Sequence, residues 1–235
     1  MELFKRRRAR PSDEMLIRDC LFVVLDTELT GLDERCDSII SIGAMKMKGG
    51  RIDLSNCFSR MIKPEAAMGR QGILVHGITP AELEEKPDAS AVLSEFSAYC
   101  LGSILVGYCL SIDLTFLNRQ LKQCPDGAMK NPAVDICRIY EWLRNRKMKI
   151  SGGTQDLPEL GRDGLYQMSG YFGVPVSGAH NALSDAFIAA QIFQRMIHIL
   201  GTREMVTVSD LLRISDPGRR LGSFDRGSAN DYFQM

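Results

Sequence analysis

Three strand-forming segments follow one another closely near the start of the chain, and they limit the fold more than any other feature. Residues 21–26, 39–48 and 51–62 are rich in strand formers and are separated by Gly-Leu-Asp and Gly-Gly turn signals. Such short connections favour an antiparallel meander. A fourth apolar strand is predicted at 103–108, after an intervening helix, so we expect a mixed sheet.

The remaining apolar residues have helical spacing. Residues 88–99 place Val92, Phe96 and Tyr99 on one face of a helix. Further helices are predicted through Phe116 to Leu121 and at 133–145, 157–172 and 181–200. The order of these elements predicts an α/β fold in which helices flank a mixed sheet.

Length and composition indicate one main domain. The chain has 235 residues, 45% of them hydrophobic and 25% charged, which is typical of a single globular domain. We expect a basic arm at 1–19, the compact domain at 20–200 and a polar, flexible tail at 201–235. The basic run of the arm is expected to be a solvated charged segment, and contact with phosphates is the alternative.

Charge and cysteine content exclude several classes of protein. Basic and acidic residues balance at 29 each, so there is no global attraction for a polyanion. No apolar run approaches the roughly 20 residues that span a bilayer, and the N-terminus lacks the features of a secretory signal. The seven cysteines contain no CxxC pair, so we expect reduced thiols in a soluble, cytoplasmic protein without a membrane partner.

Two acidic residues lie two positions apart at the end of the first strand. In an extended chain, Asp26 and Glu28 point to the same side, where their charges repel. A cation would make this pair tolerable, and carboxylate oxygens suit Mg²⁺ or Mn²⁺ better than zinc. The alternative is that the pair ends a strand and solvates a turn.

Two further acids and a histidine strengthen the prediction of a metal site. Asp113 follows the strand 103–108 at a helix start, where it could equally be a helix cap. Asp185 lies among small apolar residues of the last helix, where a lone carboxylate is costly to desolvate. His180 precedes that helix and is suited to accept a proton from water near neutral pH. His76 and His198 are expected to be a turn residue and a helix residue, respectively.

Taken in order, DTELTG (26–31), VGYCLSIDLTFLN (106–118) and HNALSDA (180–186) resemble the three motifs of the DEDDh (DnaQ-like) exonucleases. This superfamily includes the proofreading epsilon subunit of bacterial DNA polymerase III. The segment HGITPAEL (76–83) also resembles epsilon-like proteins, so the resemblance covers about residues 20–200.

The resemblance implies a ribonuclease-H-like fold with a five-stranded mixed sheet flanked by helices. It implies that Asp26, Glu28, Asp113 and Asp185 hold two Mg²⁺ or Mn²⁺ ions and that His180 is the general base. The implied reaction is hydrolysis of the terminal phosphodiester at a DNA 3′ end, which releases nucleoside 5′-monophosphates. It further implies that substrate is bound by residues of the first two motifs: Thr27, Leu29, Thr30 and Cys109.

The chain departs from the family pattern at three places. Leu29 stands where threonine is frequent, and an apolar side chain there can still pack against a terminal base. Tyr108 and Cys109 replace the usual His-Asn pair of the second motif, which puts rate and substrate choice in doubt. Ser41 replaces a frequent glutamate, and its consequence is not evident from the sequence.

Two other functions compete with DNA hydrolysis. RNA is a possible substrate, because ribonuclease T and oligoribonuclease share the same catalytic residues. A non-catalytic module that tethers a polymerase or nuclease is the second alternative, although such a module would not need clustered carboxylates. A polymerase or another replication or repair protein is a possible partner, and the tail offers no sequence that identifies one.

Overall fold

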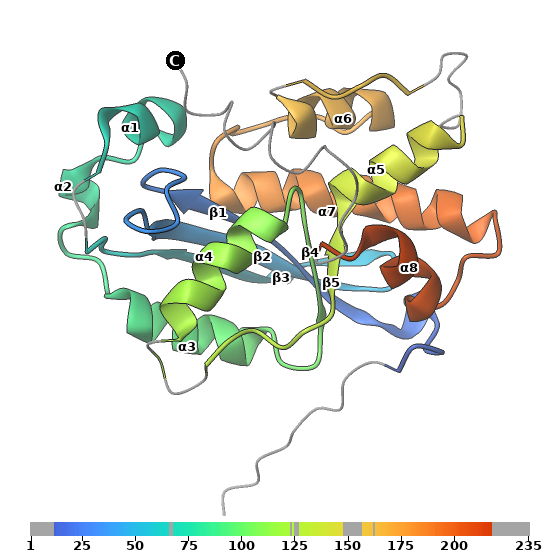
Figure 1. Cartoon of the computed structure of the whole chain (residues 1–235), viewed down its shortest axis with the longest axis horizontal. Helices are drawn as coiled ribbons and strands as arrows, with labels where there is room; N and C mark the ends of the chain where they lie inside the picture. The colour runs from blue at the N-terminus through green and yellow to red at the C-terminus, as the bar shows by residue number, and fades with distance from the viewer. Residues whose placement is uncertain are drawn as a thin grey trace, which may run out of the picture.

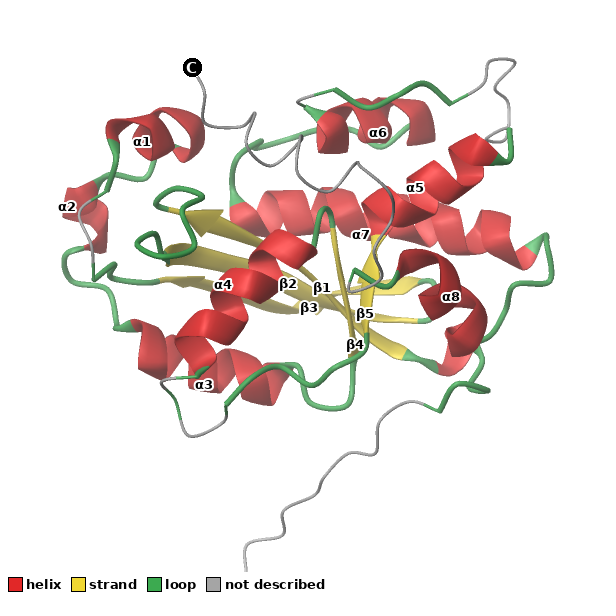
Figure 2. Ribbon diagram, viewed as in Figure 1, coloured by secondary structure: helices red, strands yellow, loops and turns green. Residues whose placement is uncertain are grey.

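The computed structural model describes residues 12–65, 68–122, 124, 127–147, 157–161 and 163–217. Its centre is a five-stranded sheet in the order β3-β2-β1-β4-β5 (Figures 1 and 2). The strands are β1 (Leu21–Leu29), β2 (Ile39–Lys48), β3 (Arg51–Met61), β4 (Ile104–Gly107) and β5 (Ala133–Asp135). β1, β2 and β3 form an antiparallel meander, and β4 and β5 continue the sheet in parallel from β1. The expected mixed sheet is confirmed.

Helices cover both faces of this sheet. Alternation along β1 sends Val23 and Leu25 into a core shared with α3 and α4, and Phe22 and Val24 into a core shared with α5 to α8. Phe22 packs edge to face on Phe193 of α7, with ring centroids 5.1 Å apart. The helices are α1 (Arg70–His76), α2 (Pro80–Leu83), α3 (Ala89–Tyr99), α4 (Ser111–Leu121), α5 (Ile136–Asn145), α6 (Gly164–Phe172), α7 (Ala182–Gly201) and α8 (Val208–Ser215), and a 3-10 turn η1 (Ile17–Asp19) precedes them.

The first turn of α7 lies directly against β2. A Cβ atom added to Gly43 would come within 2.1 Å of the backbone nitrogen of Leu183 and 2.2 Å of the Ala182 carbonyl carbon. Only glycine permits this approach, because a methyl group would overlap the helix backbone. Gly43 pairs with Asp26 on β1, so the same contact holds the start of α7 over the acidic end of β1.

Two predicted helices are shorter than expected. The segment 133–145 begins with the strand β5, and α5 starts only after Asp135, whose side chain accepts a 2.9 Å hydrogen bond from Cys137 N as the helix cap. Three strand residues leave no periodic pattern that sequence analysis could detect. Among the described residues of the segment 157–172, α6 is the only helix. The chain before it is irregular, and there the Pro158 carbonyl accepts a hydrogen bond from Tyr140 Oη.

The expectation of a tail without regular structure is wrong for α8. Thr207 and Asp210 cap this helix reciprocally, and Val208 and Leu211 are buried against the sheet core. The predicted arm also contributes structure, because Ile17 is buried and Leu16 bridges Thr207. The basic run at 5–10 and residues 218–235 lie outside the described residues. Within the described ranges, no helix has the length and apolarity to cross a membrane.

Candidate active site

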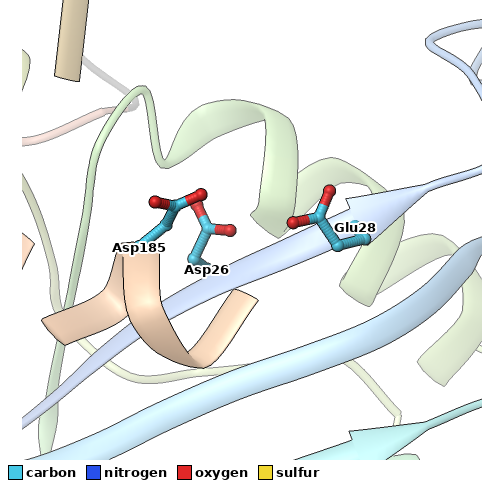
Figure 3. A group of neighbouring side chains, drawn as sticks. All are labelled: Asp26, Glu28 and Asp185. Carbon is cyan, nitrogen blue, oxygen red and sulfur yellow. The ribbon is translucent and has the colours of Figure 1, made fainter. Parts of the chain in front are cut away.

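Three carboxylates from β1 and α7 form an acidic cluster, defined here as Asp26, Glu28 and Asp185. Asp26 and Glu28 lie two residues apart on β1, and Asp185 lies in the first turn of α7. One oxygen from each carboxylate lies within 4.8 Å of the other two (Figure 3). The structure thus brings together residues from two motifs that are more than 150 residues apart.

Asp113 adds a fourth carboxylate beside the acidic cluster. It lies in the first turn of α4 and is buried. Its Oδ1 accepts a 2.5 Å hydrogen bond from Thr27 Oγ1. Since Thr27 separates Asp26 from Glu28 on β1, this bond ties α4 to the strand that carries the cluster.

Burial raises the pKa values of these carboxyl groups, and mutual repulsion adds to the effect for Asp26 and Glu28. The pKa of Asp26 is well above its ordinary value, first because of burial and then because Asp113, Glu28 and Asp185 are near. Burial, followed by repulsion from Asp185 and Asp113, raises the pKa of Glu28 to about 7. Burial also raises the pKa of Asp113 to about 7, against the opposing effect of the Thr27 bond. A cation would favour the charged forms of all of them.

His180 lies two residues before the start of α7 and contacts Tyr166 of α6. The backbone N–H of His180 lies 3.0 Å from Asp185 Oδ2 and 2.9 Å from Tyr166 Oη. Tyr166 Oη also lies 3.0 and 3.1 Å from the two Asp185 oxygens. His180 has a left-handed backbone, with φ of 59°, which is a conformation that non-glycine residues adopt at a cost.

Tyr166 is a site residue that the sequence did not reveal. It lies within α6 with no motif around it, and its contact with Asp185 joins residues that are 19 positions apart. Its packing edge to face on His180, with centroids 5.4 Å apart, is likewise a tertiary contact. Only a family pattern at this position could have signalled it.

The other two histidines, His76 and His198, lie in different helices, α1 and α7. His76 is the last residue of α1 and not a turn residue as predicted, and its Nδ1 accepts a 3.1 Å hydrogen bond from Ile78 N in the turn that follows. His76 also lines the cleft with His180, and burial, together with the nearby His180, lowers its pKa. His198 is exposed on α7, which confirms its prediction as a helix residue.

A cleft of about 150 Å³ opens over the acidic cluster. Of the residues predicted to bind substrate, Thr27, Leu29 and Cys109 line it and Thr30 does not. Thr30 is 3% exposed, and its Oγ1 donates a 2.7 Å hydrogen bond to Asp37 Oδ1. The apolar part of the lining consists of Leu29, Leu32, Val75, Ile112 and Leu165.

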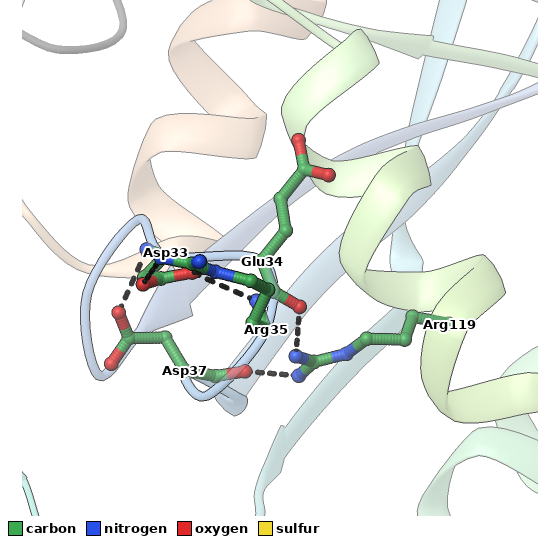
Figure 4. A network of polar contacts seen from close by, with 5 residues as sticks. All are labelled: Asp33, Glu34, Arg35, Asp37 and Arg119. Carbon is green, nitrogen blue, oxygen red and sulfur yellow. Dashed lines mark hydrogen bonds and ion pairs between the residues drawn. The ribbon is translucent and has the colours of Figure 1, made fainter.

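The loop after β1 is held by the network in Figure 4. Asp33 N donates to Asp37 Oδ2 at 2.8 Å, and Arg35 forms an ion pair of 2.8 Å with Asp33. Arg119 of α4 donates from its guanidinium group to the Glu34 and Asp37 carbonyl oxygens. Thr30 therefore helps to shape this loop, which carries Leu32 into the cleft.

Cys109 has a left-handed backbone conformation, which suits the asparagine that is usual at this position of the second motif. Its φ is 48°, and asparagine tolerates such left-handed geometry better than most residues. Its N–H donates a 3.1 Å hydrogen bond to Asp135 Oδ1. The side chain of Asp135, at the end of β5, therefore holds this turn although asparagine is absent.

Comparison with known proteins adds independent evidence. A family model described as Exonuclease (RNase_T) matches residues 23–193. The PolC-type DNA polymerase III of Thermotoga maritima is 30% identical over 206 residues, which are 87% of this chain and 14% of that protein. The DNA polymerase III subunit epsilon of Aquifex aeolicus is 30% identical over 182 residues, 77% of this chain and 83% of that protein. The predicted resemblance is confirmed.

Solved structures show the same fold. Escherichia coli exonuclease I in complex with a dT13 oligonucleotide matches with a TM-score of 0.64 and 15% identity, over 80% of this chain and 44% of that chain. Exonuclease X in complex with 5′ overhanging duplex DNA matches with a TM-score of 0.58 and 20% identity, over 82% of this chain and 98% of that chain. These matches confirm the ribonuclease-H-like fold.

Proposed function

Because the chain belongs to the Exonuclease (RNase_T) family, we propose that it hydrolyses terminal phosphodiesters at the 3′ ends of single-stranded DNA and releases nucleoside 5′-monophosphates. The observation that carries the proposal is the acidic cluster, whose three carboxylates approach within 4.8 Å beside Asp113. Such a concentration of buried acids is destabilising by itself, so it indicates a site kept for chemistry.

The donor set fits divalent cations. Carboxylate oxygens are hard ligands. Repulsion among the carboxylates contributes to the raised pKa values of Asp26 and Glu28, and a cation would relieve it. The acidic cluster and Asp113 would hold two Mg²⁺ or Mn²⁺ ions. When bound, these ions would supply positive charge for the phosphate and for the leaving 3′ oxygen.

The remaining steps belong to side chains of this chain. His180 accepts the proton from the water that attacks the terminal phosphorus. Tyr166 and the His180 backbone hold the Asp185 carboxylate in place through the bonds described above. Leu29 and Ile112 offer an apolar surface for the terminal base.

The names of the relatives favour a DNA substrate and a polymerase partner. The epsilon relative is a subunit of DNA polymerase III, and this chain covers most of its length. We propose that this chain works beside a cytoplasmic polymerase as a proofreading or end-trimming exonuclease. RNA remains the alternative substrate because the same residues serve both polymers.

A time course on matched DNA and RNA strands tests the proposal. Each strand carries a 5′ label and is incubated with Mg²⁺, Mn²⁺ or EDTA. We expect metal-dependent, stepwise shortening that is faster on DNA and falls at least about 100-fold in His180→Ala. His198→Ala, which removes an exposed histidine near the other end of α7, is the matched control and retains full activity.

Other outcomes would redirect the proposal. Faster cleavage of RNA would assign the chain to the exoribonucleases. Absence of cleavage with every metal would reject catalysis and favour the tethering module. An equal loss of nuclease activity in both histidine variants would show that His180 is not the general base.

A further inference from the structure

Two cysteines occupy equivalent positions after neighbouring parallel strands. Gly107 at the end of β4 pairs with Asp135 at the end of β5. Cys109 and Cys137 each follow two residues later. Because parallel strands end at the same edge of a sheet, both cysteines lie at the edge that carries the candidate active site.

One carboxylate oxygen fixes the spacing of the two cysteines. Asp135 Oδ1 accepts hydrogen bonds from Cys109 N at 3.1 Å and from Cys137 N at 2.9 Å. The two backbone nitrogens are therefore separated by no more than the sum of these two distances. That separation is comparable with the ~4.4–6.8 Å between Cα atoms joined by a disulfide. The Cys137 side chain, ahead of burial, is the main cause that raises the pKa of Cys109. The two side chains are therefore neighbours at this edge of the sheet.

We propose that Cys109 and Cys137 form a reversible oxidation site, at which a small-molecule disulfide such as oxidised glutathione converts them into an intramolecular disulfide. Cys137 makes the first attack, and Cys109 resolves the mixed disulfide. After losing its proton to solvent, the Cys137 sulfur attacks one sulfur of the oxidant, forms a mixed disulfide and releases one glutathione thiolate. Cys109 then loses its proton to solvent and attacks the Cys137 sulfur, which expels the second thiolate. Two protein thiols are oxidised and one disulfide is reduced.

The consequence for catalysis rests on the proposed function, whereas the disulfide itself does not. Cys109 lines the cleft, and its carbonyl oxygen accepts a 3.0 Å hydrogen bond from Ile112 N in the turn that leads to Asp113. Joining Cys109 to α5 constrains that turn. Since small displacements of catalytic groups have large effects on rate, we expect about a tenfold loss of nuclease activity.

Peptide mapping tests the site without reference to activity. The native full chain is incubated with oxidised glutathione, blocked with N-ethylmaleimide, digested and analysed by mass spectrometry. We expect a cross-linked peptide pair two hydrogens lighter than its separate thiols, with fragment ions that place the bond on Cys109 rather than on Cys100. Recovery of Cys109 and Cys137 as alkylated thiols or as stable glutathione adducts, while exposed Cys36 and Cys57 react, would overturn the proposal.

Nuclease assays on the same samples separate the two claims. Oxidised wild type is expected to lose activity and regain it with dithiothreitol, whereas Cys137→Ser keeps its activity throughout. Cys57→Ser, which removes an exposed cysteine elsewhere, behaves as wild type. If Cys137→Ser loses as much nuclease activity on oxidation as the wild type, this disulfide does not control the activity. A reduced wild type that cuts no nucleic acid, yet forms the cross-link, would reject only the proposed function.

Discussion

On one side of the cleft, Asp26, Glu28 and Asp185 are placed by a long strand and a capped helix that touch through Gly43. On the other side, Asp113 is placed by a turn with a left-handed residue, Cys109. Regular structure leaves the first three carboxylates little freedom. The turn depends instead on a few hydrogen bonds, so its position is easier to change.

This contrast indicates which part of the candidate active site is placed by regular secondary structure and which part depends on a few hydrogen bonds. On the strand and helix side, regular secondary structure places the three carboxylates, and Tyr166 and the His180 N–H contact Asp185. The turn side needs the Thr27 bond to Asp113 and the Asp135 bond to Cys109. Substitutions on the first side are therefore expected to have the larger effects on activity.

The largest effect is expected from Asp26→Ala. Removal of the central carboxylate is expected to lower the single-turnover rate by at least about 1,000-fold. The metal-free protein is expected to melt at the same or a higher temperature, because one buried, repelled group is gone. Asp53→Asn on β3 is the control. A normal rate would show that Asp26 is not part of the catalytic centre.

Gly43→Ala tests the contact between β2 and α7. The added methyl group overlaps the backbone of Leu183 and Ala182, so α7 shifts and carries Asp185 with it. We expect a loss of about 1–3 kcal/mol in the free energy of unfolding by urea and at least about a tenfold loss of activity. Gly50→Ala is the control, since its Cβ meets only Ile197 Cδ1 at 3.7 Å. Equal stability of the two variants would contradict the close approach.

Thr27→Val tests the turn side. The variant keeps the shape of the side chain but removes the donor to Asp113, so the pKa of Asp113, already about 7, rises further. Because the charged form is needed, the pH profile of activity is expected to shift to higher pH with about a tenfold loss at pH 7. Thr115→Val, which removes a bond to the Ser111 carbonyl within α4, leaves the profile in place. An unchanged profile in Thr27→Val would mean that this bond does not tune Asp113.

Tyr166→Phe is expected to have a smaller effect. It removes the hydroxyl that contacts Asp185 and the His180 backbone, but the His180 N–H still reaches Asp185. We expect about a threefold to tenfold loss in kcat with little change in KM. Tyr171→Phe, in an exposed position of α6, is the control. A loss confined to KM would assign Tyr166 to substrate binding instead.

The smallest effect concerns stability without metal. Glu28 and Asp113 have pKa values of about 7 in the folded protein, above their ordinary values. Between those ordinary values and pH 7, the folded state therefore binds more protons than the unfolded state. Their contribution to stability is therefore complete below their ordinary pKa values of about 4 and is lost as the pH rises through about 7. Each kcal/mol lost lowers Tm by about 2–4 °C. Thermal melts in EDTA are expected to show this fall and Mg²⁺ to reduce it; a rise with pH would contradict the assigned repulsion.

The sequence was sufficient for the meander and for the acidic residues on β1. Strand periodicity places Asp26 and Glu28 on one side without knowledge of any other element. The apolar surroundings of Asp185 signalled a carboxylate that needs a partner. Close approach at Gly43 was not predicted, because a single glycine in a strand does not reveal which element packs against it.

The remaining features depend on tertiary contacts or on short segments. β5 has three residues, and α8 is stabilised by its cap and by burial of Val208 and Leu211. Tyr166 reaches Asp185 only after α6 packs on α7. Thr30 belongs to a motif, yet its hydroxyl holds a loop. The contacts of β5, Tyr166 and Thr30 have no local pattern in the sequence, whereas the Thr207–Asp210 capping box of α8 is a local pattern that the sequence analysis did not use.

Titration with Mn²⁺, followed by calorimetry at pH 7, tests most directly whether the two sides form one metal centre. The account predicts two ions bound to the wild type, impaired binding in Asp26→Ala, and wild-type binding in Asp53→Asn. Binding of two ions to Asp26→Ala with unchanged affinity, or no binding to the wild type, would contradict it.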